Sequence, residues 1–474
     1  MEESLAKNKY PAYKIKAALA APHTSLAAKF CTPEIWEKYK DTKSTGPAKW
    51  TLARAINSGI SHPESFVGCH AGDRESYDDF KDFFYPVIEA YHKGFSMEKG
   101  SDLQGTASER MDPTKITVDL SASAQAKIVS TRIRVARNLS MFPLNPGGTR
   151  ASREQIATLM SKVYKGLKAG APQLAGDFFL HTTMTDEQRQ ALIDGHQLFR
   201  GKDRMQAASG YHEHWPHGRG VFHNPDKTFV NWVNEGDHLR IISMQNGGDV
   251  KAVFARLSEG AAAIEKGVRK ETGVAEGDEV FMMHPKFGAV TCCPSNIGTG
   301  MRGSVHILVP KLIASIGFDT IDKLARERNC QARGSSGEHS AVVDRIDISN
   351  WRRIGFPEYE LVQDMINCAN FLAAEEDKAP ELKVACAPCL PFMALFGSSK
   401  KANPIAQANA KQAAAEKAAA AQAQAAAAKK TALAKAKQKD DEASAFAKAS
   451  AEKALLTDAL PAEEGASAPA DASE

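Results

Sequence analysis

The segment KIVSTRIRVARNL, residues 127–139, alternates apolar and basic side chains, and this period of two predicts a β-strand. Further predicted strands are TFVNWVN and HLRIISM, on either side of a short turn at 234–237, and GSVHILVP, residues 303–310. Helix signals lie between these strands without a regular strand–helix–strand rhythm. We therefore expect an α+β fold with an antiparallel β-sheet flanked by helices rather than a doubly wound sheet.

Residues 24–95 look helical and compact, with a helix start at Thr32, where Pro33 and Glu34 follow. Later helices are predicted from Ser152, with Gln155 completing a capping box, from Thr185 with Gln188, and over residues 359–372. The predicted organisation is a small all-α N-terminal domain followed by a larger sheet domain. Its proposed boundaries are an extension at 1–23, a helical domain at 24–100, a linker at 101–127, a sheet domain at 128–395 and a tail at 396–474.

Charge and hydropathy exclude several functional classes for this 474-residue chain. Its 60 Lys and Arg nearly balance its 57 Asp and Glu, so it has no general attraction to nucleic acid or membranes. No apolar run is long enough to span a membrane, and the N-terminus is unlike a signal peptide, so we expect a cytoplasmic protein. The eight cysteines are interpreted as thiols, and the single CxxC pair, Cys386 and Cys389, as ordinary thiols rather than a metal site.

The C-terminal tail is compositionally distinct from the rest. Residues 405–460 contain neither Gly nor Pro and consist mostly of Ala, Lys, Gln and Glu. Alanine favours helix, but the apolar seam of a coiled coil is missing, so either a solvated helix or a disordered segment is expected. The tail is either an appendage without chemistry or a tether, and its partner is unknown.

Five arginines lie beside strands or glycine-rich turns and together predict an anion site. Arg132 and Arg134 lie two apart on one strand and therefore share a face. Arg240 lies in NEGDHLR, Arg302 follows a glycine-rich turn and Arg333 opens RGSSGEH. Taken singly, each of these arginines would be interpreted as an ordinary charged residue on the surface. As a group they suit phosphate, because a guanidinium donates two parallel hydrogen bonds and stays charged.

Several segments in fixed order give the chain a resemblance to a known family. They are VSTRIRVARN, WPHGRGVFHN, TFVNWVNEGDHLRIISMQNGG, CPSNIGTGMRGSVHI, RGSSGEHS and DISNWRRIGFPEYE. The chain resembles the phosphagen kinases, the family of arginine kinase and creatine kinase, from about residue 25 to about residue 395. The resemblance implies a small helical domain, a larger domain with an antiparallel sheet, and reversible transfer of the γ-phosphoryl group of MgATP to a guanidino nitrogen.

The resemblance assigns roles to the arginines and to two histidines. It places Arg132, Arg134, Arg240, Arg302 and Arg333 on the nucleotide phosphates. It places His196 and His306 beside the adenosine moiety. Magnesium is implied as part of MgATP, without dedicated protein ligands, because Mg²⁺ commonly sits on phosphates and water.

The resemblance also identifies Cys293 as the cysteine that contacts the substrate. As a thiolate it holds the guanidinium in line with the phosphoryl group, and Ser295 is placed to donate a hydrogen bond to it. Cys292 is interpreted as a packing residue. Gly298 and Gly300 are expected to let the backbone approach the nucleotide.

The family normally grips the guanidinium with two carboxylates, and only one is clearly present. Glu338 matches the glutamate typical of arginine kinases. The second should lie in an NEEDHLR motif, but this chain has NEGDHLR, with Gly236 at that position. Glycine can neither orient nor deprotonate a substrate. Glu235 and Asp237 flank the gap, and Glu235 is taken as the candidate substitute.

The specificity loop ESFVGCHAGD combines features of two family branches. Ser65, Phe66 and Val67 stand where arginine kinases bind the amino-acid end of the substrate, and His70 replaces a usual tyrosine. Tyr91 matches the arginine-kinase residue, where creatine kinases have arginine. Glu64 and Arg204 occupy the positions of a family ion pair that helps to close the two domains.

Three hypotheses follow. The first is a guanidino kinase that acts on L-arginine and buffers ATP, with taurocyamine or creatine as alternative substrates. The second is a nucleotide-binding pseudoenzyme or scaffold, in which Gly236 marks lost catalysis. The third is a cysteine hydrolase built on Cys293 and a histidine, in which the five arginines would have no purpose.

Overall fold

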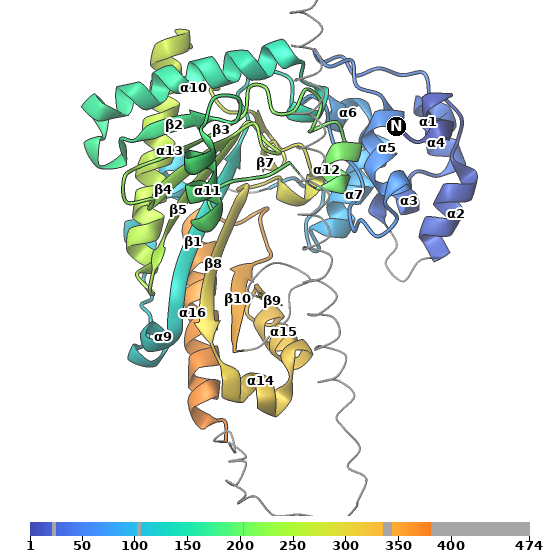
Figure 1. Ribbon diagram of the computed structural model, residues 1–474. Coiled ribbons are helices and arrows are strands. Elements are labelled where there is room, and N and C mark those ends of the chain that lie inside the picture. The colour runs from blue at the N-terminus through green and yellow to red at the C-terminus, as the bar shows by residue number, and fades with distance from the viewer. Residues whose placement is uncertain (21–24, 102–105, 202, 335–343, 381–474) are drawn as a thin grey trace, which may run out of the picture. The chain divides into compact units, whose positions relative to one another are not determined.

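The computed structural model describes residues 1–20, 25–101, 106–201, 203–334 and 344–380 (Figure 1). These residues belong to one compact unit, Met1–Val384, and a second unit, Ala385–Glu474, lies outside them. The predictions for Glu338, for the pair Cys386 and Cys389 and for the tail therefore fall outside the described residues.

The N-terminal region is helical, as the sequence predicts. Its helices are α1 (Glu3–Ala6), α2 (Ala12–Ala20), α3 (Leu26–Phe30), α4 (Pro33–Tyr39), α5 (Leu52–Ser61), α6 (Ser76–Asp79) and α7 (Lys81–Tyr91). Thr32 caps α4 by accepting from the Ile35 amide, with Pro33 at the first helical position, which confirms that predicted start. The buried core includes Trp36, and it continues into Val290 of the larger domain. The apolar contact between the two regions is therefore continuous.

Residues 106–127, predicted to be part of a pattern-free linker, contain short elements. These are α8 (Ala107–Arg110), the 3-10 turn η1 (Pro113–Lys115) and α9 (Ala122–Lys127). Thr117 donates its backbone amide to the side chain of Gln363, 2.9 Å away on a later helix. Elements of four to six residues carry too few side chains for a hydrophobic period, which explains why the pattern is invisible in the sequence.

The larger region is built on an antiparallel sheet of eight strands, which confirms the predicted α+β class. In spatial order the strands are β2 (Asp177–Leu180), β3 (Gly220–His223), β4 (Phe229–Val233), β5 (Leu239–Asn246), β1 (Ile128–Arg137), β8 (Met301–Leu308), β10 (Arg345–Asn350) and β9 (Cys330–Gly334). β6 (Met283–His284) and β7 (Gly288–Ala289) form a separate small hairpin. The central strand β1 pairs with β5 on one side and β8 on the other.

Three long helices cover one face of the sheet (Figure 1). They are α10 (Arg150–Gly170), α13 (Val250–Thr272) and α16 (Glu358–Lys378). The predicted start of α10 at Ser152 with Gln155 is wrong. Thr149 is the N-cap, and it forms the capping box with Ser152, whose hydroxyl accepts from the Thr149 amide. The Thr185–Gln188 box is confirmed.

The opposite face of the sheet is divided into an apolar half and a polar half. Over β3, β4 and β5, the side chains of Val221, Val230 and Ile242 pack against Leu192 of α11 (Asp186–Asp194) and Phe199. The remaining half, over β1, β8, β10 and β9, carries most of the arginines described below, and Arg240 extends the group onto the start of β5. The smaller elements are η2 (Asn145–Gly147), η3 (Pro172–Leu174), α12 (Arg204–Ala208), η4 (Pro294–Asn296), α14 (Pro310–Ile316) and α15 (Phe318–Arg326).

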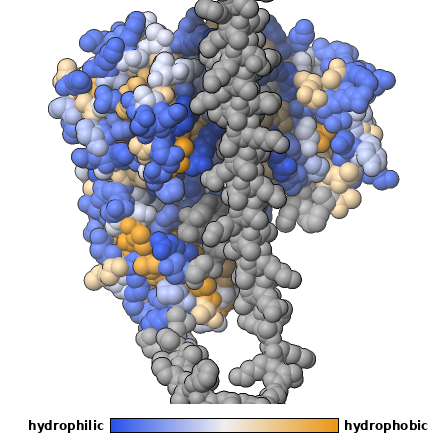
Figure 2. Space-filling model, viewed as in Figure 1, coloured by the Kyte–Doolittle hydropathy of each residue, from blue (hydrophilic) through white to orange (hydrophobic). Residues whose placement is uncertain are grey.

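The visible surface of the described residues is mostly hydrophilic, with small separated hydrophobic areas (Figure 2). Among the described helices, none has the combination of length and apolar composition that crossing a bilayer requires.

Candidate active site

Arginines from neighbouring strands lie together on the polar half of the open sheet face. This surface, which contains Arg132, Arg134, Arg240 and Arg302, is called the arginine face below. On β1, Arg132 and Arg134 point away from the helix-covered core, while Ile133 between them is buried in it. Arg134 stands opposite Arg302 on β8, and Arg240 begins the same face on β5, two residues before Ile242. The antiparallel register thus brings four of the five predicted arginines onto adjacent strands.

The arginine face is an unfavourable environment for its own charges. Burial, followed by the neighbouring cations Arg302 and Arg240, lowers the pKa of Arg132 to about 10. Burial and the adjacent guanidinium groups lower the pKa of Arg134 as well. The Nε atoms of Arg132 and Arg302 are buried and have no hydrogen-bond partner within the described part of the chain. Neighbouring, partly desolvated cations are costly without counter-charges, so this face is suited to an anion with several oxygens.

One carboxylate on the arginine face was missed by the sequence analysis. Asp347 on β10 accepts a hydrogen bond from Arg302 Nη2 at 2.8 Å, and its Oδ2 lies 3.7 Å from His306 Nε2. Burial opposes ionisation of Asp347, but the hydrogen bond from His306 and the charge of Arg302 still lower its pKa. His306 also contacts the Ser130 hydroxyl at 3.2 Å. The alternation in RIDISN, residues 345–350, is the signal that could have placed Asp347 on this face.

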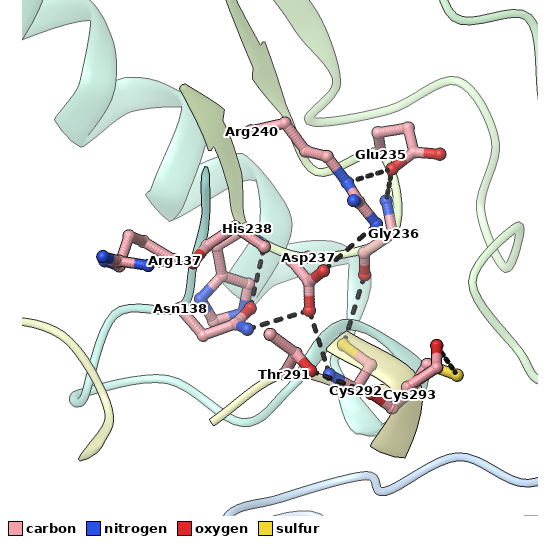
Figure 3. A network of polar contacts seen from close by, with 12 residues as sticks. Arg137, Asn138, Glu235, Gly236, Asp237, His238, Arg240, Thr291, Cys292 and Cys293 are labelled. Carbon is pink, nitrogen blue, oxygen red and sulfur yellow. Dashed lines mark hydrogen bonds and ion pairs between the residues drawn. The ribbon is translucent and has the colours of Figure 1, made fainter. Parts of the chain in front are cut away.

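Arg240 is fixed by two carboxylates that follow β4 (Figure 3). Its Nε donates to Glu235 Oε2 at 2.9 Å, and its Nη2 lies 3.2 Å from Asp237 Oδ2. Burial alone would depress the pKa of Arg240, but these two carboxylates outweigh burial and raise it. Arg240 is therefore the paired, pre-oriented arginine of the group.

Glu235, the predicted substitute for the missing acid, is already engaged by several donors. Besides Arg240 it accepts from Gln206 Nε2 at 2.9 Å and from the Gly236 amide at 2.6 Å. Burial works against its charge, yet Arg240 and these hydrogen bonds lower its pKa. A carboxylate stabilised in this way remains ionised and is a weak proton acceptor.

Gly236 lies close beside the same side chains, so a larger residue there requires the flexible end of Arg240 to shift slightly. A Cβ added there would lie 3.2 Å from Arg240 Nη2 and 3.6 Å from both Gln206 Nε2 and Tyr211 Cε1. Its backbone is outside the left-handed region that favours glycine, so a larger side chain meets no conformational barrier. The missing glutamate side chain would thus project toward Gln206 and Tyr211, two residues that the sequence analysis did not single out.

The predicted substrate cysteine lies at the start of η4. Cys293 Sγ lies 3.1 Å from the Ser295 hydroxyl, as the predicted interaction requires. Burial raises the pKa of the Cys293 thiol, while Ser295 acts in the opposite direction. The thiol form therefore predominates in this environment, and thiolate character requires an additional positive charge nearby, such as a guanidinium.

Cys292 does more than pack. Its amide donates to Asp237 Oδ1 at 2.9 Å, and its Sγ donates to the Gly236 carbonyl at 3.2 Å (Figure 3). Its carbonyl accepts from the Ala71 amide at 2.8 Å. Asn138 donates to the same Asp237 oxygen at 2.9 Å. Buried Asp237 thus joins the residue that follows β1, the Gly236 turn, Arg240 and the cysteine loop in one network.

The packing of the backbone requires glycine at positions 298 and 300, which is a different reason from the predicted approach to a nucleotide. Both adopt positive φ, 97° and 62°. A Cβ on Gly298 would lie 2.2 Å from the Arg353 carbonyl, and one on Gly300 would lie 2.8 Å from the Ala136 carbonyl. These glycines are needed for close backbone packing behind β8, whatever their relation to a nucleotide.

A cavity of about 630 Å³ joins the predicted substrate residues. Residues that line it include Ser65, Phe66, Val67, His70, Tyr91, Gln206, Tyr211, Arg240, Cys293, Arg333 and Trp351. It therefore unites the specificity loop, the cysteine and two of the five arginines. Phe66 is 61 % exposed and packs edge-to-face on Tyr91, with ring centroids 5.8 Å apart.

His70 is held between the two regions of the molecule. Its Nδ1 lies 3.1 Å from the Ser58 hydroxyl on α5 and 2.7 Å from the Ser209 hydroxyl that follows α12. Burial lowers the pKa of His70 to about 4, so the ring is neutral at physiological pH. Its ring also packs edge-to-face on Tyr211. A neutral, fixed imidazole can shape the cavity but adds no charge to it.

Other predicted residues are more peripheral. His196 is exposed, in a turn with φ of 54°. Glu64 and Arg204 lie 3.5 Å apart with 51 % and 78 % of their side chains exposed, so they form a loose surface pair.

Comparison with known proteins identifies the family. Residues 21–89 match "ATP:guanido phosphotransferase, N-terminal domain", and residues 155–379 match "ATP:guanido phosphotransferase, C-terminal catalytic domain". The chain belongs to the phosphagen kinase family. Its class is that of phosphotransferases acting on guanidino groups.

Relatives of this phosphagen kinase include arginine kinases. It is 40% identical over 347 residues to a probable arginine kinase of Caenorhabditis elegans, covering 73% of this chain and 90% of that protein. It is 39% identical over 359 residues to an arginine kinase of Anthopleura japonica, covering 75% of this chain and 47% of that protein. The chain thus spans about half the length of the Anthopleura protein.

Solved structures of two other guanidino kinases resemble it. Lombricine kinase matches with a TM-score of 0.66 and 31% identity, covering 76% of this chain and 95% of that one. The duplicated taurocyamine kinase from Schistosoma mansoni with bound transition state analog components matches with a TM-score of 0.68 and 30% identity. That match covers 80% of this chain and 49% of the solved one. The relatives therefore carry three different guanidino substrates in their names.

Proposed function

We propose that this protein transfers the γ-phosphoryl group of MgATP reversibly to a guanidino nitrogen of L-arginine and so buffers ATP. The proposal rests on one observation: a surface suited to phosphates adjoins the cavity that contains the predicted substrate residues. The arginine face, with buried Nε donors on Arg132 and Arg302, suits a polyphosphate. Of the five predicted arginines, Arg240 and Arg333 also line the cavity that contains Cys293 and the specificity loop.

In the proposed reaction, a guanidino nitrogen attacks the γ-phosphorus, a nitrogen–phosphorus bond forms, and the bond to the β–γ bridging oxygen breaks. The guanidino nitrogen loses one proton, and ADP leaves. Arg132, Arg134 and Arg302 would hold the phosphates and neutralise charge that develops on them. Magnesium enters as part of MgATP and neutralises phosphate oxygens; the arginines fit the phosphates rather than the metal.

Cys293 is proposed to orient the guanidinium. A guanidinium in the cavity would place a positive charge beside the thiol and favour its thiolate form, with Ser295 donating a hydrogen bond. Glu338 remains the proposed carboxylate partner from the sequence and lies outside the described residues. Glu235 supports the site through Arg240, because its oxygens already accept from Arg240, Gln206 and the Gly236 amide.

Arginine is favoured as the acceptor by Tyr91, which lines the cavity beside Phe66, and by the arginine kinases among the relatives. His70 departs from that pattern and leaves taurocyamine, lombricine and creatine as alternatives to be tested. A cytoplasmic location stays a prediction from the sequence.

A nucleotide-binding protein without turnover is the second candidate, favoured by one observation. Gly236 removes a carboxylate, and its neighbours Glu235 and Asp237 are both committed to Arg240. This candidate predicts nucleotide binding on the arginine face and no phosphoryl transfer.

The test is incubation of the purified protein with MgATP and each of L-arginine, taurocyamine, lombricine and creatine, with ³¹P NMR detection of a phosphoguanidine. The proposal predicts that phosphoarginine forms fastest, and that Arg134→Gln, which removes one cation of the arginine face, abolishes its formation. Faster transfer to another acceptor would replace arginine as the substrate. Nucleotide binding with no transfer to any acceptor would favour the second candidate.

A further inference from the structure

A second cavity, of about 440 Å³, lies between the segment that follows α7 and the loop between β10 and α16. It is lined by His92, Lys93, Gly94, Phe95, Ser96, Lys99, Gly100, Ser101, Trp351, Arg352, Arg353, Ile354, Gly355 and Phe356. It shares Lys93 and Trp351 with the 630 Å³ cavity that contains Cys293. The reaction proposed above assigns no role to it.

The charges around this cavity have one sign. Its described lining contains the cations Lys93, Lys99, Arg352 and Arg353 and no acidic residue. Arg352 is paired with Asp364 at 2.5 Å and stacks on Phe356 at 3.7 Å. For Lys93 and Lys99, no carboxylate lies within ion-pair distance among the described residues. Several cations gathered around one cavity raise its positive potential and so attract anions.

Two buried nitrogen atoms in the lining also need acceptors. Trp351 Nε1 and Arg352 Nε are shielded from solvent and have no hydrogen-bond partner in the described part of the chain. Buried donors without acceptors are uncommon in native proteins, because each costs free energy that a hydrogen bond would recover. An anion with several oxygens could accept from these two donors once their side chains turn toward it, while it neutralises the lysines.

The cavity is also connected to the catalytic cysteine. Arg353 Nη1 donates to the Ser295 carbonyl at 2.5 Å, and its Nε donates to the Met301 carbonyl at 3.2 Å. His92 Nε2 lies 2.8 Å from the Pro294 carbonyl. Burial lowers the pKa of His92 to about 3, so the ring is neutral and Nε2 carries the donated proton. Two side chains of this cavity therefore hold the backbone directly after Cys293.

We propose that this cavity is a second anion site, which binds a phosphate-bearing ligand through Lys93, Lys99 and the unpartnered nitrogens, next to the side chains that fix the Cys293 loop. A tetrahedral phosphate has enough acceptor oxygens for several donors at once. The ligand is either a free inorganic phosphate or the phosphate of a nucleotide. This inference does not depend on turnover at the site described above.

The test is equilibrium dialysis of radiolabelled pyrophosphate against four forms of the full chain. They are the wild type, Lys99→Glu, Arg134→Gln and Lys266→Glu. Lys99 is an exposed residue outside the catalytic cavity, and its reversal removes an attraction and adds a repulsion. Lys266→Glu on α13 is the matched control, because it changes the net charge equally on another exposed surface. Arg134→Gln removes a cation from the arginine face, which can bind pyrophosphate independently.

We expect Arg134→Gln to retain a pyrophosphate site, and Lys99→Glu to raise the Kd of that site by about tenfold while Lys266→Glu leaves it unchanged. Competition in Arg134→Gln then identifies the source: displacement by ADP indicates a nucleotide, and displacement by orthophosphate alone indicates free phosphate. The proposal is overturned if Lys99→Glu binds pyrophosphate as the wild type does, or if Arg134→Gln binds none.

Discussion

The arginine face lies beside the network of polar contacts around Asp237, and the two regions differ in how completely their charges are paired. On the arginine face, cations outnumber carboxylates, and the buried Nε atoms of Arg132 and Arg302 have no acceptors among the described residues. In the network, Asp237 accepts from Asn138 and the Cys292 amide and pairs with Arg240. The first region is incomplete without an anion, whereas the second is complete by itself. We therefore propose that the first region binds a ligand and that the second positions side chains.

The largest expected effect is on the arginine face. Arg134→Gln should lower kcat/KM about a thousandfold, because it removes a charged donor from the proposed phosphate site. The same variant should be more stable than the wild type by about 1 kcal/mol. The sign follows from the lowered pKa of Arg134: the folded protein disfavours this cation, so a neutral side chain removes a penalty. Steady-state kinetics and urea unfolding of the same samples measure both effects. A variant that loses stability together with activity would show that the cation supports the fold.

In the network around Asp237, a substitution is expected to lower the stability of the protein rather than raise it. Asp237→Ala should destabilise the protein by about 3 kcal/mol, because it leaves two amide donors without their buried acceptor and Arg240 with only one of its two carboxylates. The isosteric control Asp237→Asn keeps an oxygen toward Cys292 and should lose less. Urea unfolding of the three proteins gives the comparison. Equal stability of Asp237→Ala and the wild type would contradict a structural role for this carboxylate.

The pH dependence of Cys293 alkylation tests whether burial raises the pKa of its thiol and whether Ser295 opposes that rise. Its raised pKa means that the reactive thiolate appears only above the ordinary range of a free cysteine, and Ser295 counteracts part of that rise. The rate of alkylation by iodoacetamide should therefore rise at higher pH than for a free thiol, and Ser295→Ala should shift the midpoint higher still. Cys293→Ser identifies the labelled residue. A midpoint that stays the same or falls in Ser295→Ala would exclude a stabilising hydrogen bond.

The smallest effect is expected for the surface pair Glu64 and Arg204. Glu64→Ala should change the free energy of unfolding by no more than about 1 kcal/mol, because the pair is largely exposed. If the pair assists domain closure, as the sequence predicts, KM for the guanidino substrate should rise two- to threefold (~0.5 kcal/mol) at low salt and less at high salt. Unchanged substrate affinities and turnover would reject that role.

Sequence reasoning succeeded where a regular period determines side-chain direction. The alternation around Ile133 placed Arg132 and Arg134 on one face, and the mixed order of strands and helices predicted the antiparallel sheet. The family resemblance supplied the grouping of the five arginines, because strand register depends on residues far apart in sequence. Arg134 meets Arg302 only through the pairing of β1 with β8.

Apart from Asp347, which lies on strand β10, the residues that were missed lie in turns and short elements, where no period exists. Gln206 and Tyr211 approach Gly236 through the geometry of α12 and the turn after it. Cys292, interpreted as packing, also bonds Asp237 and Gly236 across separate segments. Such contacts are set by tertiary packing, and single-sequence propensity carries no signal for them. The same limit explains why the structural role of Gly298, set by the Arg353 carbonyl, was not predicted.

The most direct test of the proposed function is ATP-dependent phosphorylation of L-arginine by the wild type and by Gly236→Glu. A glutamate at this position starts 3.2 Å from Arg240 Nη2 at its Cβ and extends toward cavity-lining residues. We predict measurable turnover by the wild type and about a tenfold higher kcat in the variant, because a second carboxylate would orient and deprotonate the guanidinium. Nucleotide binding without turnover by the wild type, together with turnover by the variant, would contradict the proposal and show a protein that binds the phosphates but has lost its base.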